Sequence, residues 1–102
     1  MTNGYSVFWT DHALEELDTT IEYLWLNFSD VEVSRLGRSI ESILANISQN
    51  PMMYPRSDMS GGIRRAVVLR FNTLYYRLDP DDRRIEVISF YSNRKDPESQ
   101  EL

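Results

Sequence analysis

The sequence predicts one α+β domain with the element order β-α-α-β-β-β, in which a helical hairpin packs on a mostly antiparallel sheet. Three observations predict it. A short aromatic strand pattern opens the chain, two consecutive segments show helical periodicity, and three segments rich in Val, Ile, Phe and Tyr follow. At 102 residues and 41% hydrophobic content, the chain has the size and composition of one folded domain. We expect residues 1–102 to form that domain, with short flexible tails at about 1–4 and 98–102.

The first two predicted elements are a strand over residues 5–9 and the helix that follows it. Thr10 and Asp11 have side-chain oxygens that can accept a hydrogen bond from a free N–H at the start of a helix. Beyond them, apolar residues recur at alternating spacings of three and four. This spacing places them on one face of a helix, which we expect to pack on the sheet, and the residues are Leu14, Leu17, Ile21, Leu24 and Phe28.

A second helix is predicted to begin almost at once and to run to about Ser48. Ser29 and Glu32 have the spacing of a capping box, and Asn50-Pro51 ends the helix because a residue before proline avoids the helical region. Gly37 is expected to mark a close contact of this helix with the first helix or the sheet. The apolar stripe consists of Val33, Leu36, Ile40, Ile43, Leu44 and Ile47.

Three strands are predicted after a loop over residues 51–62 that is rich in Pro, Gly, Ser and Met. Asp79-Pro80-Asp81-Asp82 is a strong turn between the last two strands, and Asn72 is the expected bend between the first two. The strands cover residues 63–71, 73–78 and 84–91.

Basic residues gather in the last third of the chain, where residues 64–97 hold eight of the eleven. Residues 1–50 hold two basic groups against eight acidic ones, a charge of −6, and residues 51–97 hold nine against six, a charge of +3. The whole chain, at −5, is therefore not typical of a bulk nucleic-acid binder. An arginine-rich face would lie on the last strands. Side-chain alternation places Arg70, Tyr75 and Arg77 on it, unless a bulge at Asn72 changes the pattern.

Several kinds of chemistry lack the residues that they need. The chain has no Cys and one His, so neither a disulfide framework nor a Cys- or His-clustered metal site is expected, and no phosphate loop or dinucleotide motif is present. His12 is expected to be a surface or helix-start residue, and the acidic pairs Glu15-Glu16 and Asp81-Asp82 are expected to be solvated charge. We expect no metal, no cofactor and no membrane insertion. A reducing cytoplasm fits this composition.

The arginines are the one concentration with functional meaning. A guanidinium is a permanently charged fork that matches phosphate oxygens, and interleaved aromatic rings could stack on unpaired bases. These rings are Tyr75, Tyr76, Phe90 and Tyr91, although Tyr76 and Phe90 also fit a core. Arg83 and Arg84 are expected to pair with nearby carboxylates. Phosphate binding and surface pairing fit the other candidates equally well: Arg64, Arg65, Arg70 and Arg94.

Three segments in this order resemble the RelE/ParE superfamily of bacterial type II toxins, particularly the branch called plasmid stabilisation proteins. They read GGIRRAVVLRF, NTLYYRL and IEVISFYSNRKDP, and the likeness covers about residues 5–97. It implies a small cytoplasmic toxin that is held inactive by a co-encoded antitoxin whose C-terminal segment wraps across it. RelE-like members cut mRNA in the ribosomal A site without a metal, and ParE-like members inhibit DNA gyrase.

Carried onto this sequence, the resemblance implies two groups of site residues. The catalytic group would consist of Arg65, Arg70, Tyr91 and Arg94, and the RNA-binding group of Arg64, Arg77, Asn93 and Lys95. Two positions depart from the branch. Ser92 stands where the branch typically has a His, and Asn72 where it typically has a Pro. The missing His removes a proton-transfer group, for which Tyr91 could substitute.

The sequence therefore predicts the toxin of a type II toxin–antitoxin pair, with a cognate antitoxin as its partner. As a ribosome-dependent endoribonuclease it would act on the ribosome and mRNA. Arg65, Arg70 and Arg94 would converge on the scissile phosphate beside Tyr91. The alternatives are a non-enzymatic inhibitor of DNA gyrase and a family member that only binds its antitoxin. One sequence does not select among these three.

Overall fold

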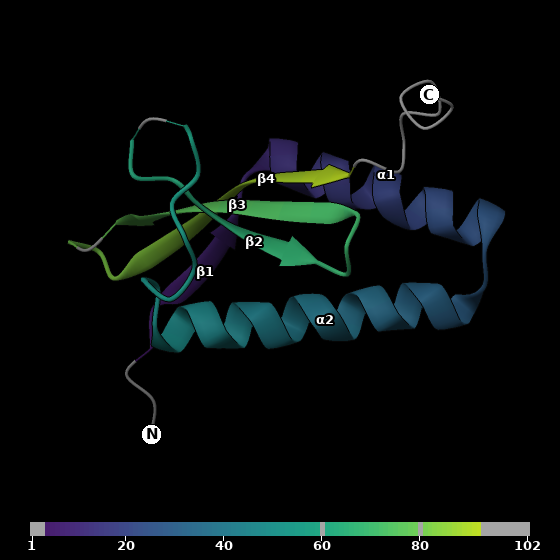
Figure 1. Cartoon of the computed structure of the whole chain (residues 1–102), viewed down its shortest axis with the longest axis horizontal. Coiled ribbons are helices and arrows are strands. Elements are labelled where there is room, and N and C mark those ends of the chain that lie inside the picture. Colours follow the sequence, from purple (N-terminus) through teal and green to yellow (C-terminus); the bar gives the residue numbers. More distant parts are fainter. Residues whose placement is uncertain (1–3, 60, 80, 93–102) are drawn as a thin grey trace.

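The computed structural model describes residues 4–59, 61–79 and 81–92. The predicted α+β order is confirmed, because two helices lie on a four-stranded, mostly antiparallel sheet (Figure 1). The expected tails fall largely outside the described residues. The elements are β1 (Ser6–Trp9), α1 (Asp11–Asn27), α2 (Asp30–Gln49), β2 (Arg64–Val68), β3 (Asn72–Asp79) and β4 (Arg84–Ser92).

The strands lie in the order β1-β4-β3-β2. β2, β3 and β4 form an antiparallel meander, and β1 pairs in parallel with the first half of β4. A parallel pair needs a crossover between its strands. Here the chain crosses through the helical hairpin and the first two strands of the meander, so the first and last strands of the chain become neighbours. The β2–β3 turn and the α1–α2 connection lie toward the same end of the molecule (Figure 1).

The two helices begin differently. Thr10 caps α1 as predicted, because its Oγ1 accepts a hydrogen bond from the Ala13 N–H at 3.1 Å. The capping box predicted for α2 is wrong. Ser29 occupies the cap position without a side-chain bond, and its backbone carbonyl accepts from the N–H groups of Glu32 and Val33. The Glu32 carboxylate turns along the helix instead, toward Arg35 at 3.4 Å.

The core lies between the helices and the inner face of the sheet. The stripe predicted for α2 is confirmed. Leu36, Ile40, Ile43 and Ile47 are buried, and Val33 and Leu44 pack partly against them. In α1, Leu24 is buried and Leu17 and Ile21 are partly buried, but Leu14 and Phe28 are exposed, contrary to the prediction. The buried face is rotated toward Ala13 and Thr20. Thr20 fits there because its hydroxyl donates to the Glu16 carbonyl within the helix.

The strand boundaries shift where the first turn falls. The strand predicted over residues 63–71 ends at Val68, and the predicted bend at Asn72 is wrong. Residues 69–71 form the turn between the paired residues Val68 and Asn72, so Asn72 begins β3. The buried Asn72 side chain donates to the Val68 carbonyl at 3.1 Å and holds the turn closed.

Gly37 does not mark a close contact. It lies on the exposed side of α2, and a Cβ at this position would meet no atom within 4 Å. The close packing that we expected at this position is therefore absent.

No helix within the described residues is long and apolar enough to cross a membrane.

The burial of α2 gives a test of the fold. Leu36 is 1% exposed, so Leu36→Ala should lower the free energy of unfolding by about 2–5 kcal/mol through lost transfer energy and the cavity left behind. Leu26→Ala is the matched control, because Leu26 is a helix leucine that is 77% exposed, and its loss should change stability by less than about 0.5 kcal/mol. Urea unfolding measures both. Equal effects of the two substitutions would contradict this packing.

Candidate functional site

The outer face of the sheet carries most of the predicted site residues that the structure describes. Side chains alternate along each strand. Ala66, Val68, Leu74 and Tyr76 therefore face the core. The register places Arg65 beside Tyr75 and Val67 beside Thr73, and Thr73 is in turn beside Tyr91. These residues, together with Arg77, form what we call the open face. The prediction that Tyr75 and Arg77 lie there is confirmed.

Arg65 and Tyr75 line a hollow of about 310 Å³ on the open face. The other wall is the loop segment Ser57, Asp58 and Met59. This segment is held in shape because the Ser57 Oγ accepts from the Met59 N–H at 3.1 Å and the Ser57 N–H donates to the Ile63 carbonyl at 2.8 Å. The hollow therefore combines one guanidinium, one carboxylate and one aromatic ring.

Arg70 lies elsewhere, in the β2–β3 turn. Leu69 and Arg70 have φ angles of 58° and 91°, which residues other than glycine adopt only at a cost in free energy. The Arg70 guanidinium lies 5.6 Å from the centre of the Phe71 ring. These three turn residues line a hollow of about 320 Å³ whose other wall is the start of α2, at Glu32 and Arg35. Arg65 and Arg70 thus line two hollows that have no residue in common.

Tyr91 is 44% exposed on the open face, near the end of β4. Arg65 is on β2 and Tyr91 is on β4, with β3 between them. Because neighbouring strands are about 4.8 Å apart, the backbones of β2 and β4 are separated by roughly 10 Å. Asn93, Arg94 and Lys95 lie outside the described residues. The predicted convergence of Arg65, Arg70 and Arg94 beside Tyr91 therefore stays a prediction as far as Arg94 is concerned.

Arg64 and Tyr76 hold the loop before β2 from the inner side of the sheet. The Arg64 guanidinium donates to the Tyr54 carbonyl at 2.7 Å, and the buried Tyr76 hydroxyl donates to the Pro51 carbonyl at 2.7 Å. Burial raises the pKa of Tyr76 to about 12, although the nearby Arg64 cation lowers it. The contacts of Arg64 join it to the protein backbone, and RNA binding by this residue stays a prediction.

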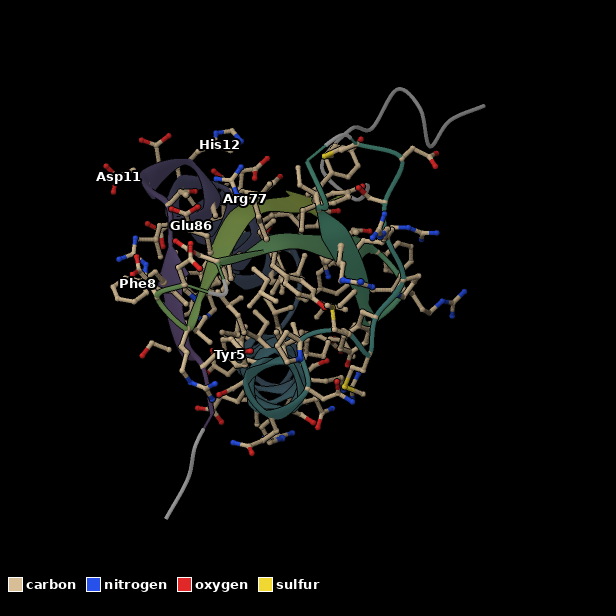
Figure 2. The ribbon with its side chains drawn as sticks, turned by 90° about the vertical axis from the view of Figure 1, so that its left-hand side faces the viewer. Tyr5, Phe8, Asp11, His12, Arg77 and Glu86 are labelled. Carbon is tan, nitrogen blue, oxygen red and sulfur yellow. The ribbon has the colours of Figure 1, made fainter. Side chains whose placement is uncertain are left out.

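Arg77 and Arg84 contact the protein's own side chains. Arg77 donates to Glu86 across β3 and β4 at 2.8 Å (Figure 2). The pair borders a hollow of about 220 Å³ together with Leu78, Asp79 and Arg84. The Arg84 guanidinium stacks 4.6 Å from the centre of the Phe8 ring, where the sequence predicted a carboxylate partner.

Glu16 is not the solvated charge that the sequence predicts. Its side chain is 15% exposed, and Oε1 accepts from the Phe90 N–H at 2.7 Å and from the Ser89 hydroxyl at 2.8 Å. His12 lies on the surface, as expected, with Nε2 3.3 Å from the same oxygen. These partners are 73 and 74 residues away in sequence, so no local pattern could have identified them.

The described residues contain no group of three or more acidic or His side chains that could hold a metal.

Comparisons with known proteins find a family with a similar sequence and a solved structure with a similar fold. A family model described as "ParE toxin of type II toxin-antitoxin system, parDE" matches residues 7–97. A chain from the solved "Chromosomal ParDE TA system from P. aeruginosa" is 16% identical and superposes with a TM-score of 0.71, covering 89% of this chain and 98% of that one. At this identity the likeness shows the fold alone. No curated protein matches the chain.

Because the Tyr76 hydroxyl is buried, the free energy of unfolding should vary with pH in the alkaline range. The unfolded chain releases this proton near pH 10, whereas the folded chain retains it to about pH 12. The contribution of the hydroxyl is thus intact below about pH 10 and falls by up to about 1.4 kcal/mol per pH unit between there and about pH 12. Tyr76→Phe should lack this slope, and Tyr75→Phe, on the open face, should keep it. Urea unfolding at several alkaline pH values measures the difference. Parallel curves for wild type and Tyr76→Phe would contradict the assignment.

Proposed function

Because the chain belongs to the ParE toxin family of type II toxin–antitoxin systems, we propose that it inhibits its target by binding, as the resemblance implies for gyrase-inhibiting members, and not by cutting RNA. The family match over residues 7–97 carries this proposal. DNA gyrase is the proposed target. The site of action would then be the cytoplasm, where gyrase works on the chromosome.

The positions of the described arginines support a binder over a ribonuclease. A ribonuclease that works without a metal needs several guanidiniums around one phosphate, because they must stabilise charge that develops on its oxygens. Arg65 and Arg70 line separate hollows. Arg64 and Arg77 contact the protein's own carbonyl and carboxylate groups. The described part of the chain thus supplies spaced charges, which suit a protein partner.

Ribonuclease activity remains the second candidate because one hollow on the open face suits an unpaired nucleotide. The hollow beside Arg65 pairs a guanidinium with the Tyr75 ring, and a phosphate and a base could occupy these two. In that mechanism Arg70 and Arg94 would join Arg65 at the phosphate, and Tyr91 would act on the ribose 2′-hydroxyl. Arg64, Arg77, Asn93 and Lys95 would bind the flanking RNA.

A toxin of this family is paired with a cognate antitoxin, and the hollow under the β2–β3 turn suits a segment of such a partner. The hollow lies between the helical hairpin and the sheet and combines apolar Leu69 and Phe71 with the ion pair of Glu32 and Arg35. The helical hairpin is strongly acidic. We therefore infer that the docking segment presents apolar groups to this hollow, where Arg35 and Arg70 outnumber Glu32, and is neutral or basic where it crosses the acidic hairpin, because like charges would repel it.

The choice between binder and ribonuclease can be tested in one strain. On induction, wild type should arrest growth with an SOS response, should inhibit supercoiling by purified gyrase, and should leave mRNA 5′ ends unchanged. Tyr91→Phe and the matched Tyr75→Phe should both keep full toxicity. Cuts within translated codons that fall about 10²–10³-fold in rate in Tyr91→Phe would favour the ribonuclease. No growth arrest from wild type would favour a member that only binds its antitoxin.

Antitoxin docking has a separate test. Phe71→Ala removes an apolar side chain from the hollow and should raise the Kd of the complex with the adjacent gene product at least about tenfold, since a few buried aromatic anchors dominate protein interfaces. Leu14→Ala is the control, because Leu14 is also exposed but lies at the far end of α1. Titration calorimetry measures both. An unchanged Kd in Phe71→Ala would place the antitoxin elsewhere.

A further inference from the structure

The sheet has two edges, and the described chain covers them unequally. At the β2 edge, the preceding loop supplies a β-bridge between Arg56 and Arg64 and two backbone hydrogen bonds, one of which joins the Arg65 N–H to the Pro55 carbonyl at 3.1 Å. β1 forms the other edge and runs along the left-hand rim of the molecule in Figure 2. At the start of this edge the end of α2 covers the backbone, because the Tyr5 N–H donates to the Ser48 carbonyl at 2.9 Å and the Ser48 hydroxyl donates to the Tyr5 carbonyl at 2.7 Å. Among residues 4–59, 61–79 and 81–92, no strand pairs with the outer side of β1 beyond Tyr5.

The backbone of β1 offers hydrogen-bonding groups at this rim. The Ser6 N–H donates to the Arg83 carbonyl and the Thr10 N–H to the Val87 carbonyl, both at 3.0 Å. Backbone groups alternate in direction along a strand, so those of Ser6, Phe8 and Thr10 face β4 and those of the alternate residues face the other way. The N–H and C=O groups of Val7 and Trp9 are therefore directed away from β4, toward the position that a further strand would take. An edge of this kind is a template for pairing with another chain.

The side chains along β1 make this edge self-complementary. Phe8, at its centre, is 48% exposed on the open face under the Arg84 guanidinium. Arg84 pairs with Ser6 at the start of β1, so this end carries positive charge. Exposed Asp11 follows the other end of the strand, on the same side of the molecule as Phe8 (Figure 2). The edge is thus apolar at Phe8, positive from Phe8 toward the Ser6 end, where Arg84 lies over the Phe8 ring and Arg83 over the Tyr5 ring, and negative at the Asp11 end.

We propose that two copies of this chain form a dimer in which their β1 strands pair antiparallel about a two-fold axis at Phe8. In this register Val7 faces the partner's Trp9, and the two such pairs exchange four backbone hydrogen bonds. The two Phe8 rings lie directly opposite each other as a non-hydrogen-bonded pair. The Arg84 end of each copy meets the Asp11 end of the other, and the two sheets become one. The observations that support this dimer do not depend on which target the protein inhibits.

A second copy fits this edge because the two-fold axis satisfies three features at once. It pairs the outward backbone groups, it gives the exposed Phe8 an apolar neighbour, and it joins opposite charges at both ends. An isologous contact requires each of these, since the same patch must complement itself. A strand from a different protein would need to match the charge order independently.

A cysteine cross-link tests the register directly. The chain contains no Cys, so Phe8→Cys introduces a single thiol. Opposed residues of a non-hydrogen-bonded pair have Cβ atoms about 4.5–5.5 Å apart, close enough for a disulfide after small adjustment. Mild oxidation of the full-length variant at low concentration should give a covalent dimer. Val67→Cys, which is 56% exposed on β2, is the control and should remain monomeric. Equal cross-linking of both variants, or none in Phe8→Cys, would overturn the proposal.

Charge reversal gives a second test that leaves Phe8 intact. Asp11→Lys alone and Arg84→Glu alone should each raise the dimer Kd about tenfold, because both ends of the interface then carry like charges. An equimolar mixture of the two variants should restore the wild-type Kd, because opposite charges then meet at both ends. Sedimentation velocity measures the dimer, and circular dichroism checks the fold of each variant. A wild-type chain that is monomeric at about 100 μM, or a mixture that is not restored, would refute the β1 dimer.

Discussion

The structure depends on how the backbone of β4 is satisfied beyond Val87. β1 pairs with β4 only as far as that residue, and the chain then leaves the sheet to begin α1. The register between β3 and β4 also shifts between Tyr75 and Tyr76, so β4 carries a bulge nearby. Strand N–H groups that lost β1 as a partner would be costly to bury unpaired. Glu16 resolves this, because its carboxylate accepts from the Phe90 N–H at 2.7 Å.

This contact also places the first helix. Thr10 caps α1 with the same Oγ1 that donates to the Ile88 carbonyl, so the start of the helix is joined to β4 at its cap and again at Glu16. With α1 fixed over β4, α2 follows through a short connection and lays its apolar stripe on the rest of the sheet. These polar contacts between distant segments thus hold in position the helical hairpin that builds the core.

Several arginines also make contacts that stabilise the protein itself. Arg64 holds the loop before β2, Arg77 pairs with Glu86, and Arg84 stacks on Phe8. Each guanidinium therefore contributes to the sheet or its edges before any ligand is considered. In an acidic protein of this size, such contacts leave the charge distributed over the surface. A distributed surface suits recognition of proteins, in which complementary charges set the orientation of the partner.

The sequence by itself determined the element order, the α2 stripe, the Thr10 cap and the family, because these depend on local spacing and on ordered segments. Tertiary structure alone decided the turn at residues 69–71, the burial of Glu16 and the separation of Arg65 from Arg70. The turn residues include no Gly, Pro, Asn or Asp to signal a turn, and Phe71 has high strand propensity, so only the pairing of Val68 with Asn72 shows that they leave the strand. Glu16 meets its partners 73 and 74 residues away, and such long-range contacts leave no periodic signal in the chain.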